Sequence, residues 1–244
     1  MSQVEGRNPV LEALKEGRVK KLFIAVGQEN QEKIQEILEI AAKKHVLFEV
    51  VEKARLNNMS RVSRHQGVIG ITEAPTYSSL RQLLFSTESR DLCVVVLDRV
   101  QDPQNLGNVL RTAEAVKADM VVVPERNAVG LTPAVERASM GGSSYVPIAR
   151  ENLHRALKML GEDGIRIISV DPAGTSEYFS IDLRGPVAFV FGGEGTGINP
   201  TLLGRSDIVV RIPMMGRVST LNVSSAVAIV LFERLRQMAS HKDR

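Results

Sequence analysis

Apolar residues recur along the chain with two different periods, and these separate expected strands from expected helices. Short runs rich in Val, Ile and Leu, bounded by Gly, Pro or polar residues, predict strands at 22–26, 46–51, 68–71, 92–97, 120–123, 165–170, 187–191 and 208–212. Apolar residues three and four positions apart predict helices at 7–16, 31–44, 80–85, 106–116, 133–140, 153–162 and 223–238. From residue 91 onward, apolar strands alternate with helices, which is typical of a parallel α/β sheet covered on both faces.

The same pattern divides the chain into three segments. Residues 1–72 predict a small α/β unit, in which Asn8 is expected to cap the first helix and Pro9 to occupy its first position. Residues 73–90 include Pro75 and many Ser and Thr residues, so we expect a linker around a short helix. Residues 91–244 then form the larger α/β domain.

The composition is ordinary for a soluble globular protein, with 43% apolar and 24% charged residues among 244. No apolar run approaches the ~20 residues of a membrane span, and the N-terminus lacks the basic and apolar regions of a secretory signal. The single Cys93 cannot build a disulfide framework, and its apolar neighbours predict a small buried side chain. We therefore expect a cytoplasmic protein with no membrane partner.

Three polar stretches follow expected strands, and core packing explains none of them. They are 98–107 (DRVQDPQNLG), which leads into a helix carrying Arg111, then 192–197 (GGEGTG), and 209–236, where a polar cluster precedes the last helix. Ligands of open parallel sheets bind beyond the carboxyl ends of the strands. We expect the three loops to share one site, although Arg111 alone is also compatible with a solvated surface residue.

The glycine-rich loop GGEGTG invites a nucleotide interpretation, with a plain turn as the alternative. It matches neither the dinucleotide fingerprint nor the phosphate loop with its Lys, and Glu194 would stand where a phosphate must sit. A cationic or zwitterionic ligand tolerates that carboxylate better. S-adenosylmethionine, with a sulfonium and an adenosine but no phosphate, is such a ligand.

Taken together, LDRVQDPQNLGNVLRTAEA, VFGGEGTGI and IPMMGRVSTLNVSSAVAIVLFE closely resemble the three motifs of the SpoU (TrmH) family of RNA ribose 2'-O-methyltransferases, in the right order between residues 97 and 233. The N-terminal unit, from VEGRNPVLEAL to RHQGVIG, resembles the L30e/L7Ae-like substrate-binding domain of the members that act on ribosomal RNA. The resemblance implies a SPOUT-type α/β domain with a deep C-terminal trefoil knot. It also implies a homodimer.

Family positions carry over to named residues of this chain. The cofactor S-adenosylmethionine would be bound by the following six residues: Gly192, Gly193, Gly195, Ile212, Met214 and Leu221. The polar active-site positions correspond to Asn105, Arg111, Glu194, Ser219 and Asn222. The implied reaction is methyl transfer to a ribose 2'-hydroxyl of ribosomal RNA, with a guanosine of 23S rRNA as the target.

A guanidinium is not deprotonated in proteins, so Arg111 is not expected to act as the base. We expect Arg111 to hold the adjacent phosphate and lower the pKa of the hydroxyl, while the proton leaves through phosphate or water. Asn105 and Asn222 would orient the ribose or the loop backbone. Ser219 would cap the last helix or contact RNA.

The formal excess of positive charge lies in residues 1–72, with 12 Lys and Arg against 9 Asp and Glu, while the remainder is balanced. Because only 4% of residues are aromatic, with no Trp, a base-stacking platform is disfavoured. We expect salt-dependent RNA binding through phosphate contacts from Arg7, Lys20, Lys21, Arg61, Arg64 and His65. His65 could instead be an ordinary surface residue.

Alternative functions remain open. A tRNA ribose 2'-O-methyltransferase is the nearest, although relatives of that kind generally lack the N-terminal unit. A non-catalytic RNA-binding or ribosome-assembly factor is the second, and the intact polar set argues against it. A NAD-binding enzyme is disfavoured because no dinucleotide fingerprint follows the first strand of either domain. The four His residues lack ligand spacing, so no metal is expected.

Overall fold

The computed structural model of the protein describes residues 2–60, 65–72, 76–86, 91–195, 197–217 and 219–242. The chain separates into two compact units, Met1–Thr76 and Tyr77–Arg244. The short helix expected at 80–85 is α4 (Leu80–Ser86). Leu80 is fully buried in the core of the second unit. Residues 77–86 of the expected linker are therefore part of the second unit, because α4 contributes an apolar face to that core.

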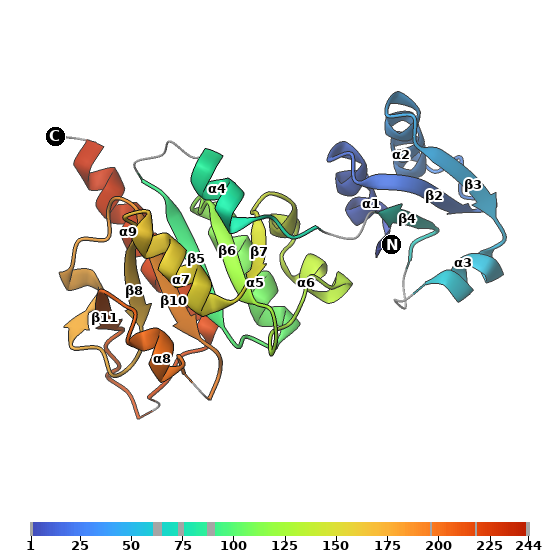
Figure 1. Cartoon of the computed structure of the whole chain (residues 1–244). Coiled ribbons are helices and arrows are strands. Elements are labelled where there is room, and N and C mark those ends of the chain that lie inside the picture. The colour runs from blue at the N-terminus through green and yellow to red at the C-terminus, as the bar shows by residue number, and fades with distance from the viewer. Residues whose placement is uncertain are drawn as a thin grey trace. The chain divides into compact units, whose positions relative to one another are not determined.

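The first unit is a four-stranded sheet with helices on both faces (Figure 1). Its strands, in the order β1-β4-β2-β3, are β1 (Ser2–Glu5), β4 (Val68–Thr72), β2 (Val19–Ala25) and β3 (Leu47–Val51). The pair β2 and β3 is parallel, and the other two pairs are antiparallel. One face packs on α1 (Arg7–Lys15) and α2 (Glu32–Lys43), and Leu56 of α3 (Lys53–Met59) packs on the other.

Sequence patterns missed two elements of this unit and misplaced one cap. The strand β1 and the helix α3 are too short to show a clear apolar period. The first helix is capped by Gly6 with φ 95°, not by Asn8, and no side chain completes that cap. Asn8 is instead the second helical residue. A glycine adopts this positive φ without strain. The pair Asn8-Pro9 had indicated a helix start two residues later in the chain.

The second unit is a seven-stranded sheet in which every strand pairing is parallel. Its strands, in spatial order, are β7 (Ile148–Glu151), β6 (Met120–Pro124), β5 (Cys93–Asp98), β10 (Val187–Gly192), β8 (Arg166–Val170), β11 (Ile208–Arg211) and β9 (Ser176–Glu177). The sequence predicted five of these strands and missed β7 and β9, which are only four and two residues long.

Alternate residues of the central strands enter separate cores on the two faces of this sheet. One core lies under α5 (Pro103–Ala115), α6 (Pro133–Ala138) and α9 (Val223–Lys242). The other lies under α4, α7 (Leu153–Glu162) and α8 (Pro200–Leu203). The sheet is thus covered on both faces, as its apolar strands predicted.

Cys93 is buried in the first of these cores, as expected for a thiol among apolar neighbours. Burial raises the pKa of the Cys93 thiol to about 11. No helix among the described residues has the length and apolar character needed to cross a bilayer.

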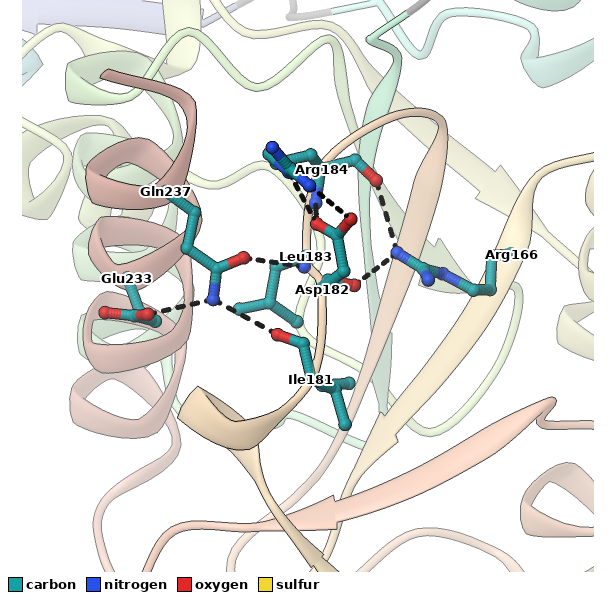
Figure 2. A network of polar contacts seen from close by, with 7 residues as sticks. All are labelled: Arg166, Ile181, Asp182, Leu183, Arg184, Glu233 and Gln237. Atoms are coloured by element: carbon teal, nitrogen blue, oxygen red, sulfur yellow. Dashed lines mark hydrogen bonds and ion pairs between the residues drawn. The ribbon is translucent and has the colours of Figure 1, made fainter. Parts of the chain in front are cut away.

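A polar network fixes the C-terminal helix to the loop that precedes β10 (Figure 2). The Gln237 side chain receives a hydrogen bond from the Leu183 N–H at 2.8 Å and donates to the Ile181 carbonyl at 3.2 Å. Glu233 accepts from the same Gln237 amide at 2.9 Å. On the other side of the loop, Arg166 donates to the carbonyl of Asp182 at 2.5 Å (Figure 2). One glutamine therefore anchors the last turns of α9.

We predict that Gln237→Ala lowers the free energy of unfolding by roughly 1–3 kcal/mol, because the buried Leu183 N–H loses its acceptor. Thermal unfolding measures the change. The neighbouring Arg236→Ala is the matched control, since the Arg236 side chain is itself exposed and its loss leaves no buried main-chain donor unpaired, so the melting temperature should change little. Equal effects of the two substitutions would contradict this assignment.

Candidate active site

The ends of β5 and β10 lie side by side in the middle of the parallel sheet. Gly192 pairs with Asp98, so the loops that follow the two strands start from the same point. On its other edge β5 pairs with β6, whereas β10 pairs with β8, so the chain leaves this point in opposite directions. Such a switch point is the usual ligand position in open α/β sheets.

Two glycines allow the loops to approach this closely. A Cβ atom on Gly192 would lie 2.1 Å from the carbonyl carbon of Gly197, and one on Gly193 would lie 2.3 Å from the Arg99 oxygen. Both contacts are with backbone, which cannot move aside. The Gly193 N–H instead donates to the Asp98 carbonyl at 2.7 Å. The predicted glycine loop is therefore a close backbone packing arrangement at the strand ends.

Asp98 and Arg99 hold this loop, and sequence reasoning named neither of them as a site residue. The Asp98 carboxylate accepts from the Asn199 N–H at 2.8 Å and lies 3.3 Å from Nε of Arg99. Arg99 also donates to the Gly197 carbonyl at 3.2 Å and has φ 60°. One feature of the sequence could have indicated this role. Asp98 directly follows the apolar run 92–97, and a carboxylate buried there needs polar partners.

Three of the predicted polar residues form one hydrogen-bonded group. The Asn105 side chain, which is 5% exposed, donates to Oε1 of Glu194 at 2.6 Å. Nδ2 of Asn222 lies 2.7 Å from the same carboxylate oxygen and 2.8 Å from Oδ1 of Asn105. The three residues come from α5, the loop after β10 and the start of α9. Glu194 therefore aligns two amide groups at the switch point.

Asn222 also caps the last helix. Its Oδ1 accepts from the Ser224 N–H at 2.9 Å and from the Ser224 hydroxyl at 2.6 Å. Asn222 is thus the cap, and the expectation that Ser219 might serve in that role is wrong. Ser219 is exposed and has no recorded contact with the Asn105–Glu194–Asn222 group.

The structure does not bring Arg111 into this group. Arg111 is exposed and has no hydrogen-bond or ion-pair partner within the described residues. Gly107, four residues earlier on the same helix, packs closely against Ala138 of α6, whereas the Arg111 side chain is open to solvent. That Arg111 faces the loops therefore stays a prediction. Arg111 also lies about 9 Å farther along the helix axis than Asn105.

The other predicted cofactor residues lie in the segment between β11 and α9. Ile212 packs partly against the core, whereas Met214 and Leu221 are 37% and 39% exposed. Apart from Val218, which lies outside the described residues, residues 213–221 make no recorded hydrogen bond within the chain. The segment thus offers apolar side chains together with unpaired main-chain donors and acceptors.

These groups fit a ligand that joins an apolar ring system to a positive charge. The main chain of residues 213–221 can pair with the edge of a base, and Met214 and Leu221 can contact its faces. Carboxylates lie at these strand ends, among them Glu194, while Arg99 is turned toward Asp98 and Gly197. Within the described part of the chain, no cluster of His, Cys, Asp or Glu could hold a metal ion.

Two family profiles cover nearly the whole chain. The profile for RNA 2'-O ribose methyltransferase substrate binding matches residues 3–78, and that of the SpoU rRNA methylase family matches residues 92–232. The two matches, a substrate-binding unit followed by a methylase domain, are those of an RNA 2'-O-ribose methyltransferase. The chain belongs to the SpoU rRNA methylase family. The predicted family is thereby confirmed.

Individual relatives agree with this assignment. A putative TrmH family tRNA/rRNA methyltransferase, YacO of Bacillus subtilis, is 35% identical over 96% of this chain and 95% of its own. The 23S rRNA (guanosine-2'-O-)-methyltransferase RlmB of a Burkholderia species is 42% identical over 82% of this chain and 81% of its own. The crystal structure of an AdoMet-bound rRNA methyltransferase from Sinorhizobium meliloti has a TM-score of 0.82 at 29% identity, covering 97% of this chain and 87% of that one.

We predict that Glu194→Ala destabilises the second unit by roughly 1–3 kcal/mol, because the buried Asn105 amide loses its acceptor. Glu194→Gln retains an oxygen at the same place and should cost less. Thermal unfolding of the two variants measures the difference. Equal destabilisation by the two substitutions would show that the charge, and not the acceptor, holds the amides.

Proposed function

We propose that this protein transfers a methyl group from S-adenosylmethionine to the ribose 2'-hydroxyl of a guanosine in 23S ribosomal RNA. The observation that carries the proposal is the Asn105–Glu194–Asn222 group at the switch point of a SpoU-family domain. The 42% identity to the Burkholderia 23S rRNA enzyme supports the RNA class. Residues 1–72 would bind RNA and residues 91–244 would perform catalysis. Because its proposed substrate is ribosomal RNA, the protein would act in the cytoplasm.

S-adenosylmethionine is the methyl donor, as the AdoMet-bound Sinorhizobium relative and the family assignment support. Bound at this site, it would supply an electrophilic methyl group carried on a cationic sulfonium sulfur. Gly192, Gly193 and Gly195 would form one wall, with Ile212, Met214 and Leu221 on the other. The negative charge of Glu194 favours the cationic ligand.

The chain's own contribution is then positioning. Holding a weak nucleophile in line with the methyl group supplies much of the rate enhancement. Asn105 and Asn222 are fixed by Glu194, so their remaining polar atoms can orient the ribose. Arg111 binds the phosphate next to the reacting hydroxyl and lowers the pKa of that hydroxyl. The proton then leaves to the phosphate or to water. Ser219, exposed beside this site, contacts RNA in this scheme.

We further propose that two copies of the chain form a homodimer. The helix α9 exposes Phe232 and Leu235, which are 51% and 40% exposed and would be covered by a second copy. Arg111 is separated from the Asn105–Glu194–Asn222 group within one copy. A dimer in which Arg111 of one copy approaches that group in the other would complete the site.

The C-terminal segment is proposed to form a trefoil knot. The strand β11 lies between β8 and β9, yet α9 returns to pack on α5 and β10. The residues between them must therefore cross the carboxyl ends of the strands, and they end with Asn222 against Asn105 and Glu194. Knots are very rare among protein folds, so the family assignment carries more weight here than the path alone.

A tRNA substrate is the second candidate, because the Bacillus relative is described as a tRNA/rRNA methyltransferase. Transfer of tritiated methyl groups from S-adenosylmethionine to unmodified transcripts separates the two. We expect label in 23S rRNA and little in 16S rRNA or tRNA, with the modified nucleotide resistant to alkaline cleavage. Label confined to tRNA would replace the substrate, and no label in any RNA would favour a non-catalytic role.

We predict that Arg111→Ala and Asn105→Ala each abolish methyl transfer but leave S-adenosylmethionine affinity, measured by calorimetry, nearly unchanged. Loss of that affinity would place either residue in the cofactor pocket. For Arg111→Lys, a near-normal rate whose pH profile moves toward the Lys pKa would favour direct base action over phosphate binding.

Mixing the two alanine variants tests the shared site. Each mixed dimer would contain one site with both Asn105 and Arg111 intact, so activity should return. Continued inactivity of verified mixed dimers would place both residues in the site of a single copy.

A further inference from the structure

The first unit contains a cavity that is distinct from the proposed methyl-transfer site. It has a volume of about 640 Å³, within the ~300–1,000 Å³ range of ligand pockets. All of its described lining residues fall between Arg7 and Gly67, so the first unit alone forms it. Its described lining residues include the three cations Arg7, Lys33 and Lys53 and no carboxylate.

Arg7 is held in place without a negative partner. Its Nε donates to the Gln66 carbonyl at 3.2 Å, and its Nη2 donates to the side-chain oxygens of Gln28, at 3.3 Å, and Gln31. These acceptors are neutral, so the positive charge of the guanidinium is not compensated. Among the described residues no hydrogen bond uses Nη1, which leaves two N–H donors for a ligand.

Three carboxamides of the described lining, those of Gln28, Asn57 and Gln66, are turned so that their oxygens face protein donors. Gln66 accepts from the Arg7 N–H at 3.0 Å, and Gln28 accepts from the Arg7 guanidinium. Asn57 lies 2.8 Å from Nε2 of His65, whose Nδ1 accepts from the Gly67 N–H at 3.1 Å. The proton of the neutral ring is therefore on Nε2, and Asn57 accepts it. The NH₂ groups of the three carboxamides remain as donors.

His65 is 9% exposed, so the alternative that it is an ordinary surface residue is wrong. Because both of its ring nitrogens are engaged within the unit, it orients Asn57 and does not itself bind RNA through them. Two other residues that were predicted to bind RNA, Lys20 and Lys21, do not line this cavity. Lys21 pairs with Glu49 at 2.9 Å, and Lys20, on the same strand, does not line it. Arg61 and Arg64 lie outside the described residues.

A cavity lined by uncompensated cations and by donors selects a ligand made of acceptors with negative charge. We propose that it binds one backbone phosphate of the RNA substrate, through Arg7, Lys33 and Lys53 with the carboxamides of Gln28, Asn57 and Gln66. Glu36 weakens this field only slightly, since it lies 4.0 Å from Nζ of Lys33 in an exposed pair. Such a contact positions the RNA but does not distinguish one base sequence from another.

The proposal rests on the proposed RNA methyltransferase function. Its test uses the full chain and unmodified 23S rRNA transcript, with affinity measured by filter binding between low and moderate KCl. Lys33→Gln and Lys53→Gln should each weaken binding about fivefold and reduce the slope of log K against log salt by about one. Lys43→Gln, the same change at the far end of α2 from Lys33, should alter neither.

Asn57→Asp provides an independent variant. The aspartate keeps an oxygen for the His65 Nε2–H but replaces the amide donor with negative charge. Affinity should fall further than for the lysine variants, and the loss should be greatest at low salt. Thermal unfolding shows whether each variant is folded. A loss that depends on RNA sequence and leaves the salt slope unchanged would identify a base-reading pocket and overturn the phosphate assignment.

Methyl transfer at saturating RNA separates this proposal from the function on which it rests. If the lysine variants bind RNA like the parent, and the parent methylates RNA, the phosphate site is wrong and the enzyme function stands. If the parent methylates no RNA, the function is wrong whatever the binding data show. Weakened RNA binding with an unchanged turnover rate supports both.

Discussion

The hydrogen bond from the Gly193 N–H to the Asp98 carbonyl joins the loops after β5 and β10, and the candidate site depends on it. It forms because neither Gly192 nor Gly193 carries a Cβ that would strike the facing backbone. The loop then presents Glu194 to Asn105, which the start of α5 holds just below the surface. Asn222 completes the group from the far end of the chain. A single backbone contact thus determines where three separate segments meet.

The two units contain different kinds of polar surface. In the second unit the polar side chains of Asn105, Glu194 and Asn222 are hydrogen-bonded to one another in a defined geometry. In the first unit the side-chain oxygens are paired inward and the cationic groups point to a cavity. The first arrangement favours directional hydrogen bonds, and the second favours charge. Their physical demands differ, since screening by salt weakens the charged contacts more than the paired amides.

Long apolar elements were predictable from the sequence because their period reflects burial. The helix α7 matches its predicted bounds, and β5, β8, β10 and β11 lie within a residue of theirs at each end. Short elements such as β9 and α3 were not, since a few residues show no period. For the site, family motifs named Asn105, Glu194 and Asn222, which the structure brings together. The same motifs named Arg111, but its side chain is exposed and makes no hydrogen bond or ion pair within the described residues, so its place in the site stays a prediction. Asp98 and Arg99 were missed because their role is to hold a loop.

Asn222 takes part in two structural features, the start of the last helix and the hydrogen-bonded group at the switch point. Its side-chain oxygen caps the N-terminus of α9, while its side-chain nitrogen binds Glu194 and Asn105. The described residues of the segment before it, 213–217 and 219–221, make no hydrogen bonds of their own. A ligand that ordered residues 213–221 would therefore also stabilise the first turn of α9. By thermodynamic reciprocity, anything that secures that turn would tighten ligand binding by the same factor. If a second copy packs along α9, its association energy would be coupled to ligand binding through this one asparagine.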